Sequence, residues 1–172
     1  MSARPRPATG RKGDAVRARA ARGAGSARAP SDPAVRLDPR TWTPRALMRE
    51  ADRARRRAYA PYSRFPVGAA LLARDGTVIH GCNVENASYG LTVCAERNAM
   101  FQAVSRGLED VIAIAVTARE GRGAPPCGSC RQVLHEFGPR MRVIWRDARG
   151  RLRERRLNEL LPDAFVLRED QR

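Results

Sequence analysis

Apolar residues gather in short blocks, and these blocks begin only after residue 40 of the chain. Two of them, Val67–Ala73 and Thr77–Val84, are strand-like and flank an Asp75-Gly76 pair. An Asp-Gly pair between two such blocks is typical of a β-hairpin, because Asp and Gly suit a tight turn. The pattern therefore predicts an antiparallel pair of strands over this region.

Three later blocks predict the rest of a sheet. Val111–Ala118 is an almost uninterrupted apolar run, as expected for a strand that is covered on both faces. Arg142–Arg146 and residues 152–156 are shorter, and we expect them to form the fourth and fifth strands.

Helices are predicted around these strands. Thr43 suits an N-cap and Pro44 suits the first helical position, so a helix is expected from there to about Tyr59, ended by Pro61. Three further helices are expected at 94–106, 128–137 and Leu157–Leu161. The order of elements predicts an α/β fold with one mixed sheet and helices on both faces.

Residues 1–40 differ from the rest of the chain in composition. They are mainly Ala, Arg, Gly, Pro and Ser, with almost no large apolar side chain. Such a segment cannot bury enough surface to offset its conformational entropy, so we expect it to be disordered. The folded domain is expected to span residues 41–172.

The formal net charge of +15 by itself suggests a nucleic-acid binder. Residues 1–40 hold ten Lys or Arg against three Asp, a net +7, which predicts weak and salt-sensitive binding of RNA or DNA by this tail. Aromatic residues make up only 5% of the chain and do not alternate with the basic tail, which therefore lacks a base-stacking platform. The abundance of Arg and Ala equally indicates a GC-rich genome.

Apolar runs are too short for a membrane protein, since none approaches the roughly 18–20 residues that span a bilayer. The basic N-terminal segment has no apolar stretch typical of a signal peptide, so we expect a cytoplasmic location. An organellar transit peptide is the alternative, but Pro and Gly interrupt any amphipathic helix there.

Candidate chemistry begins with Cys127 and Cys130, which stand at the start of a predicted helix. Two cysteines three positions apart at a helix N-terminus can both face one metal ion. The free amides and the dipole there also favour thiolate over thiol. A Cys-x-x-Cys pair is only moderately specific, because a redox pair and a purely structural pair share its spacing.

Cys94 also begins a predicted helix, and two helix starts that converge can offer three thiolates to Zn²⁺. Three protein ligands leave the fourth tetrahedral position open, which is the catalytic arrangement. Cys82 as a fourth ligand would close the site, but it lies in a strand pattern and is expected to be a small buried hydrophobe.

Glu96 and Arg97 stand two and three residues after the proposed ligand Cys94. A carboxylate two residues after a zinc ligand can move a proton between water and a leaving group. A guanidinium hydrogen-bonded to a ligand sulfur would draw charge from the thiolates and tune the metal. The usual alternative for both residues is a solvated position on a helix surface.

Several segments of the chain resemble one family, the small homotetrameric zinc-dependent cytidine deaminases. The resemblance covers about residues 43 to 168. Its motifs are Cys94-Ala95-Glu96-Arg97-Asn98-Ala99, Pro126-Cys127-Gly128-Ser129-Cys130-Arg131-Gln132, the segments 62–70 and 81–89, and Asn158-Glu159-Leu160-Leu161-Pro162.

The resemblance implies a three-layer αβα sandwich around a five-stranded mixed sheet and hydrolytic deamination of cytidine and deoxycytidine in pyrimidine salvage. Zinc would be bound by Cys94, Cys127 and Cys130, and Glu96 would be the proton shuttle. Relatives that edit RNA or DNA typically carry His as the first ligand, so Cys94 favours a free nucleoside as substrate.

The resemblance also implies how the substrate and the neighbouring subunits are held. Asn83 and Glu85 would bind the ribose hydroxyls, Phe65 would pack on the pyrimidine ring, and Ala95 would be a further substrate contact. Within a homotetramer, Phe165 would reach the active site of a neighbouring subunit. Tyr62 and Tyr89 would lie near subunit contacts.

Two other functions fit parts of the chain. Blasticidin-S deaminase is a small relative with the same three-cysteine chemistry, but Arg97 and the segment 83–89 favour cytidine. A nucleic-acid-binding module with a structural zinc site is the alternative from another class. Ammonia release from cytidine distinguishes a cytidine deaminase from such a module, whereas zinc content alone does not.

Overall fold

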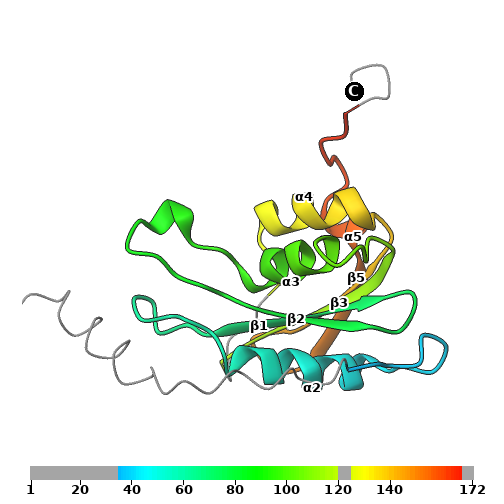
Figure 1. Cartoon of the computed structure of the whole chain (residues 1–172), viewed down its shortest axis with the longest axis horizontal. Helices are drawn as coiled ribbons and strands as arrows, with labels where there is room; N and C mark the ends of the chain where they lie inside the picture. The colour runs from blue at the N-terminus through cyan, green and yellow to red at the C-terminus, as the bar shows by residue number, and fades with distance from the viewer. Residues whose placement is uncertain (1–34, 120–124, 168–172) are drawn as a thin grey trace, which may run out of the picture. The chain divides into compact units, whose positions relative to one another are not determined.

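The structure, a computed structural model, describes residues 35–119 and 125–167. Figure 1 shows the described residues coloured in chain order and labels most of their helices and strands. They are α2 (Pro44–Arg55), β1 (Val67–Ala73), β2 (Val78–Cys82), η1 (Tyr89–Leu91), α3 (Ala95–Val104), β3 (Val111–Ala118), α4 (Gly128–Phe137), β4 (Arg142–Arg146), β5 (Leu152–Arg156) and α5 (Leu157–Leu160).

The five strands form one mixed sheet in the order β2-β1-β3-β4-β5. β1 is antiparallel to both β2 and β3, β3 and β4 are parallel, and β4 and β5 are antiparallel. The predicted hairpin and the predicted mixed sheet are confirmed. β2 is shorter than expected, because beyond Cys82 the chain leaves β1 and Val84 instead bridges singly to Tyr59 and Val93.

Helices cover both faces of the sheet, with α2 on one side and α3, α4 and α5 on the other (Figure 1). Successive side chains of a strand point to opposite faces, so β1 contributes to two cores. Ala69 and Leu71 pack in the cluster that contains the buried residues of α3, and Ala70 and Leu72 pack in the cluster that contains those of α2. The three-layer αβα sandwich is therefore confirmed.

Helix α2 begins as predicted but ends earlier. The Thr43 hydroxyl accepts a hydrogen bond from the amide of Ala46 at 3.2 Å, as expected of an N-cap. The predicted extension to Tyr59 is wrong, because the helix ends at Arg55. Tyr59 instead extends beside the chain that follows β2, where its amide donates to the carbonyl of Asn83 at 3.0 Å.

The folded domain begins before residue 41, the boundary expected from composition. The Leu37 amide donates to the Gly76 carbonyl at 2.8 Å, and the Val78 amide donates to the Val35 carbonyl at 2.9 Å. Both Val35 and Leu37 pack against the core on the α2 side of the sheet. The expected disorder is therefore wrong for 35–40, and for 1–34 it lies outside the described residues.

None of the helices in the described part of the chain has both the length and the apolar character needed to cross a membrane.

Candidate metal and active site

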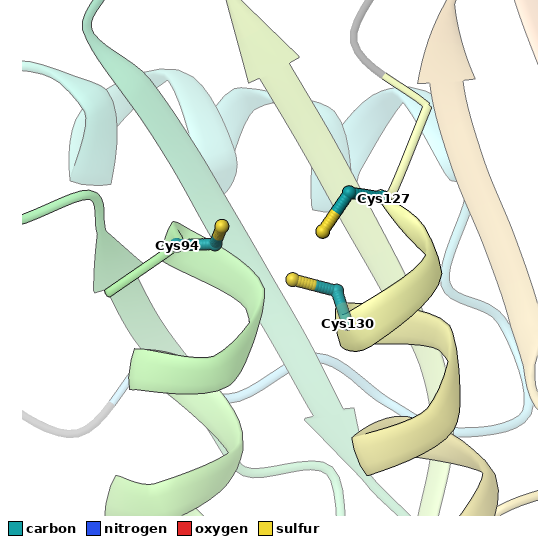
Figure 2. Close-up of side chains that lie close together, drawn as sticks. All are labelled: Cys94, Cys127 and Cys130. Atoms are coloured by element: carbon teal, nitrogen blue, oxygen red, sulfur yellow. The ribbon is translucent and has the colours of Figure 1, made fainter. Parts of the chain in front are cut away.

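Three cysteines meet where the N-termini of α3 and α4 face each other (Figure 2). Cys94 is the N-cap of α3, Cys127 is the N-cap of α4, and Cys130 lies in the first turn of α4. Their sulfur atoms all lie within 4.8 Å of one another. The two helix starts that were expected to converge are therefore brought together by the fold.

The backbone of β2 allows α3 to come this close. A methyl group on Gly81 would lie 2.3 Å from the carbonyl oxygen of Ala95 and 2.5 Å from the amide nitrogen of Ala99. Only a residue without a Cβ fits at such a contact. Gly81 therefore sets the position of the first turn of α3, and with it the position of Cys94.

The cysteine cluster stabilises negative charge on Cys94. A hydrogen bond from Cys130 outweighs burial and, together with Arg97, lowers the pKa of the Cys94 thiol to about 5. The same hydrogen bond and burial raise the pKa of Cys130. Arg97 donates from Nη2 to the Cys94 sulfur at 3.8 Å and to the Thr92 carbonyl at 3.1 Å. The guanidinium is thus held against the thiolate by the backbone before α3.

This set of residues fits Zn²⁺. Zinc–sulfur bonds of about 2.3 Å place tetrahedral ligand sulfurs roughly 3.8 Å apart, which is within the observed spread. Cys82 is outside the cluster, since its thiol donates to the Arg57 carbonyl at 3.4 Å and burial raises its pKa. Three cysteine ligands leave one coordination position open, as in catalytic rather than structural zinc sites.

Glu96 lies in the first turn of α3 and is only 4% exposed. Burial raises the pKa of its carboxyl group, and the nearby charge of Cys94 acts in the same direction. A raised pKa makes a carboxyl group hold a proton more readily, as suits a group that accepts and returns protons. Ala95, the residue between Cys94 and Glu96, is fully buried at the start of the same helix.

Asn83 and Glu85 lie beyond the end of β2 and contact the loop that enters β1. Asn83 accepts from the Val67 amide at 2.8 Å and donates to the Phe65 carbonyl at 3.0 Å. Glu85 accepts from the Tyr62 amide at 2.9 Å. The proposed sugar-binding pair and the proposed ring-packing residue therefore belong to one hydrogen-bonded unit.

Hydrogen bonds also set the charge of Glu85. Partial burial by itself raises the pKa of its carboxyl group, but hydrogen bonds from the Ser63 hydroxyl and from the amides of Tyr62 and Ser63 outweigh burial and lower it. Glu85 is therefore held as a carboxylate, the form that accepts hydrogen bonds from hydroxyl groups.

The aromatic residues expected at subunit contacts lie on the surface of the protomer. The rings of Tyr62 and Tyr89 meet edge to face with centroids 6.0 Å apart, and Tyr89 is 74% exposed. Phe165 is 70% exposed, and its backbone is bound at both ends by the side-chain amide of Gln132. The structure does not place Phe165 in the cysteine cluster of its own chain.

Sequence reasoning missed three residues that hold the site together. They are Ser63, which bonds Glu85, Gln132, which fixes the backbone of Phe165, and Arg131, which joins the carbonyls of Pro126 and Leu160. All three stand within the motifs that carry the resemblance, but no role was expected for them. Their partners, however, lie far along the chain and could not be identified from local pattern.

Known proteins similar to this chain share the regions that carry the site. Residues 42–146 match the family model described as the cytidine and deoxycytidylate deaminase zinc-binding region. A cytidine deaminase of Halalkalibacterium halodurans is 56% identical over 121 residues, which cover 70% of this chain and 92% of that protein. A cytidine deaminase of Mycobacterium tuberculosis is 51% identical over 110 residues, which cover 64% of this chain and 80% of that protein.

Solved structures agree with these relatives. The crystal structure of cytidine deaminase from Burkholderia pseudomallei is 50% identical, with a TM-score of 0.68, and the match covers 72% of this chain and all of that one. The crystal structure of cytidine deaminase from Mycobacterium tuberculosis is 46% identical, with a TM-score of 0.65, over 74% of this chain and all of that one.

Proposed function

Because the chain belongs to the cytidine and deoxycytidylate deaminase family, we propose that it is a zinc-dependent hydrolase that converts cytidine to uridine and ammonia. The observation that carries this proposal is the convergence of Cys94, Cys127 and Cys130 at two helix starts, with Glu96 buried in the first turn beside them. Three sulfur ligands and a buried carboxyl group are the parts that hydrolytic deamination requires.

Cys94, Cys127 and Cys130 would hold Zn²⁺, which would lower the pKa of a water molecule at the open position. Glu96 would take the two protons of this water one after the other and would pass one to N3 of the pyrimidine and the other to the departing amino group. Arg97, hydrogen-bonded to the Cys94 sulfur, reduces the negative charge that three thiolates place at the site. The water attacks C4, the bond from C4 to the amino nitrogen breaks, and ammonia leaves.

The nucleoside is recognised by the loop before β1, the segment after β2 and the start of α3. Asn83 and Glu85 bind the ribose hydroxyls, Phe65 packs on the pyrimidine ring, and Ala95 contacts the base. Among residues 35–119 and 125–167, the Asn83 side-chain N–H groups have one recorded acceptor, the Phe65 carbonyl, so the second N–H is left for a ligand, which supports this role. Deoxycytidine is a second substrate of the same site, and both reactions belong to pyrimidine salvage in the cytoplasm.

The active form is a homotetramer. The exposure of Tyr62, Tyr89 and Phe165 on the protomer supports this proposal, since contact with other subunits would bury these large side chains. Phe165 is presented outward by Gln132 and reaches the active site of a neighbouring subunit, while Tyr62 and Tyr89 lie near subunit contacts.

Ammonia release from cytidine tests the proposed function. The purified chain is loaded with zinc, and ammonia and uridine are measured together, with and without prior removal of the metal by a chelator. We expect equal amounts of both products and loss of turnover without zinc. A folded chain that holds one zinc ion and yet releases no ammonia from cytidine would contradict the proposal.

A further inference from the structure

The loop from Ala60 to Pro66, which leads into β1, has an unusual backbone. Arg64 has a φ of 55° and is the only residue other than glycine with a positive φ in the described ranges 35–119 and 125–167. Its amide donates to the Ala60 carbonyl at 3.1 Å. The left-handed region is costly for a residue with a side chain, and such strain persists only where the surrounding contacts enforce it.

Glu85 provides part of these contacts through its carboxylate. One oxygen, Oε2, accepts from the amides of Tyr62 at 2.9 Å and Ser63 at 3.2 Å, and the other, Oε1, accepts from the Ser63 hydroxyl. A carboxylate offers about four acceptor positions, so the loop occupies three of them. The remaining position is on Oε1, beside the serine hydroxyl.

The Ser63 hydroxyl has a second partner. Its oxygen accepts from the amide of Phe65 at 3.0 Å while its proton goes to Glu85. On the other side of Phe65, the carbonyl accepts from the side chain of Asn83 at 3.0 Å. The amide and the carbonyl of Phe65 are therefore both fixed by polar side chains. Asn83 and Glu85, the residues assigned to the ribose, both bond the loop that carries Phe65, the residue assigned to the base.

We propose that Ser63 is a positioning residue for nucleoside binding, an inference that rests on the proposed function. Its hydroxyl fixes which acceptor position of Glu85 remains for a sugar hydroxyl, and it sets the backbone of Phe65 at the same time. A site whose groups are already oriented loses less conformational freedom when the ligand binds. Ser63 thus acts on substrate affinity through Glu85 and Phe65 and takes no part in the chemical step.

The first test compares Ser63→Ala with the parent chain in the cytidine assay. Because a hydrogen bond to a charged group is lost, we expect KM to rise about tenfold or more while kcat stays within about threefold. Ser63→Thr keeps the hydroxyl and is expected to restore most of the affinity. Ser105→Ala is the matched control, since the Ser105 hydroxyl donates to the Gln102 carbonyl at the end of α3, away from the loop before β1.

A double-mutant cycle tests whether Ser63 acts through Glu85. When Glu85→Gln is already present, adding Ser63→Ala is expected to raise KM less than Ser63→Ala does in the parent chain, because the two side chains share one interaction. Fully additive effects on KM would overturn the role through Glu85. Zinc content and unfolding temperature are measured for each variant.

Other results of these experiments would overturn the role of Ser63. An unchanged KM in Ser63→Ala, or a fall in kcat with unchanged KM, overturns the inference while the proposed function stands. A Ser63→Ala chain that is unfolded at the assay temperature makes Ser63 a folding residue and likewise overturns it. A parent chain that releases no ammonia overturns the proposed function and this inference together.

Discussion

Cys94 caps α3 and Glu96 lies in its first turn, so one helix end carries both a thiolate and a buried carboxyl group. The two side chains have opposite electrostatic surroundings. Hydrogen bonds from Cys130 and Arg97 lower the pKa of Cys94, whereas burial raises the pKa of Glu96. Two neighbouring groups whose pKa values are shifted in opposite directions from their ordinary values are typical of a functional site.

Replacement of Glu96 by Ala is expected to abolish most deamination while zinc and fold are kept. The carboxyl group carries protons but is not a ligand, so its loss removes acid–base catalysis, which typically contributes about 10²- to 10⁴-fold. Initial rates with cytidine and zinc content by elemental analysis check this. The control is Glu109→Ala at an exposed position before β3. Turnover of Glu96→Ala within about threefold of the parent would disprove the assignment.

Replacement of Cys82 by Ser is expected to leave one zinc ion per chain. The thiol of Cys82 donates to the Arg57 carbonyl and lies outside the sulfur cluster, and a serine hydroxyl can make the same hydrogen bond. Cys127→Ser is the matched comparison and is expected to lose the metal, because it removes one of three ligands. A folded Cys82→Ser chain without zinc would show instead that Cys82 is a ligand.

At the scale of elements, the sequence best predicts the strands whose ends are set by local signals. β1, β3, β4 and β5 have the predicted bounds, because each is a block between turn residues or helix starts. The end of α2 was missed because no local signal stops that helix at Arg55. After Arg55 the chain leaves the helix, and Tyr59 pairs with Val84 in the segment after β2. Such pairing depends on tertiary structure.

The candidate site was predictable to a similar degree. The three cysteines were found because each stands at or near a predicted helix start, and helix starts favour thiolates. The contacts of Glu85 and Asn83 with the loop before β1 were not found, because they depend on how β1 and β2 pair. Sequence pattern predicts which residues carry chemistry, whereas the hydrogen bonds that orient them require the fold.

Packing of α3 against β2 gives a prediction at the scale of elements. Gly81→Ala places a methyl group in contact with the backbone of Ala95 and Ala99, so α3 must shift away from the sheet. Overpacking of this kind typically costs about 1–3 kcal/mol in the free energy of unfolding. We expect a lower unfolding midpoint in denaturant and weaker zinc retention, since Cys94 moves with the helix.

Gly128→Ala is the matched control for this prediction. Gly128 also lies at the start of a helix beside the metal site, but an added methyl group there meets nothing within 4 Å. Its stability and zinc content are therefore expected to equal those of the parent. Equal stability of Gly81→Ala and the parent would show that α3 tolerates the shift and that Gly81 does not set its position.

At the scale of the whole molecule, activity is expected to depend on association. Phe165 is 70% exposed on the protomer, so Phe165→Ala removes little buried surface from its own chain. If Phe165 completes a neighbour's site, the variant keeps its fold and zinc but loses activity. Light scattering together with the cytidine assay checks this prediction. A fully active monomer would rule out the proposed assembly.

The N-terminal boundary gives a second prediction at this scale. Val35 and Leu37 pack on the core, and their backbone groups bond Val78 and Gly76 beside the hairpin turn. A chain that begins at Val35 is therefore expected to unfold at the same temperature as the full chain. A chain that begins at residue 41 loses these contacts and is expected to unfold at a lower temperature, although both retain every residue assigned to the site.

The same truncation separates catalysis from binding of polyanions. Residues 1–34 hold eight Lys or Arg against two Asp, a net +6, and none is assigned to the site. The chain from Val35 is expected to keep the parent's KM for cytidine and to bind RNA or DNA less tightly at low salt, because neutralised phosphates release counterions in proportion to the cations engaged. Retention on immobilised nucleic acid at two salt concentrations measures this. A KM that changes more than about threefold would place the tail in the site, and unchanged retention would assign the binding to the arginines of the folded domain.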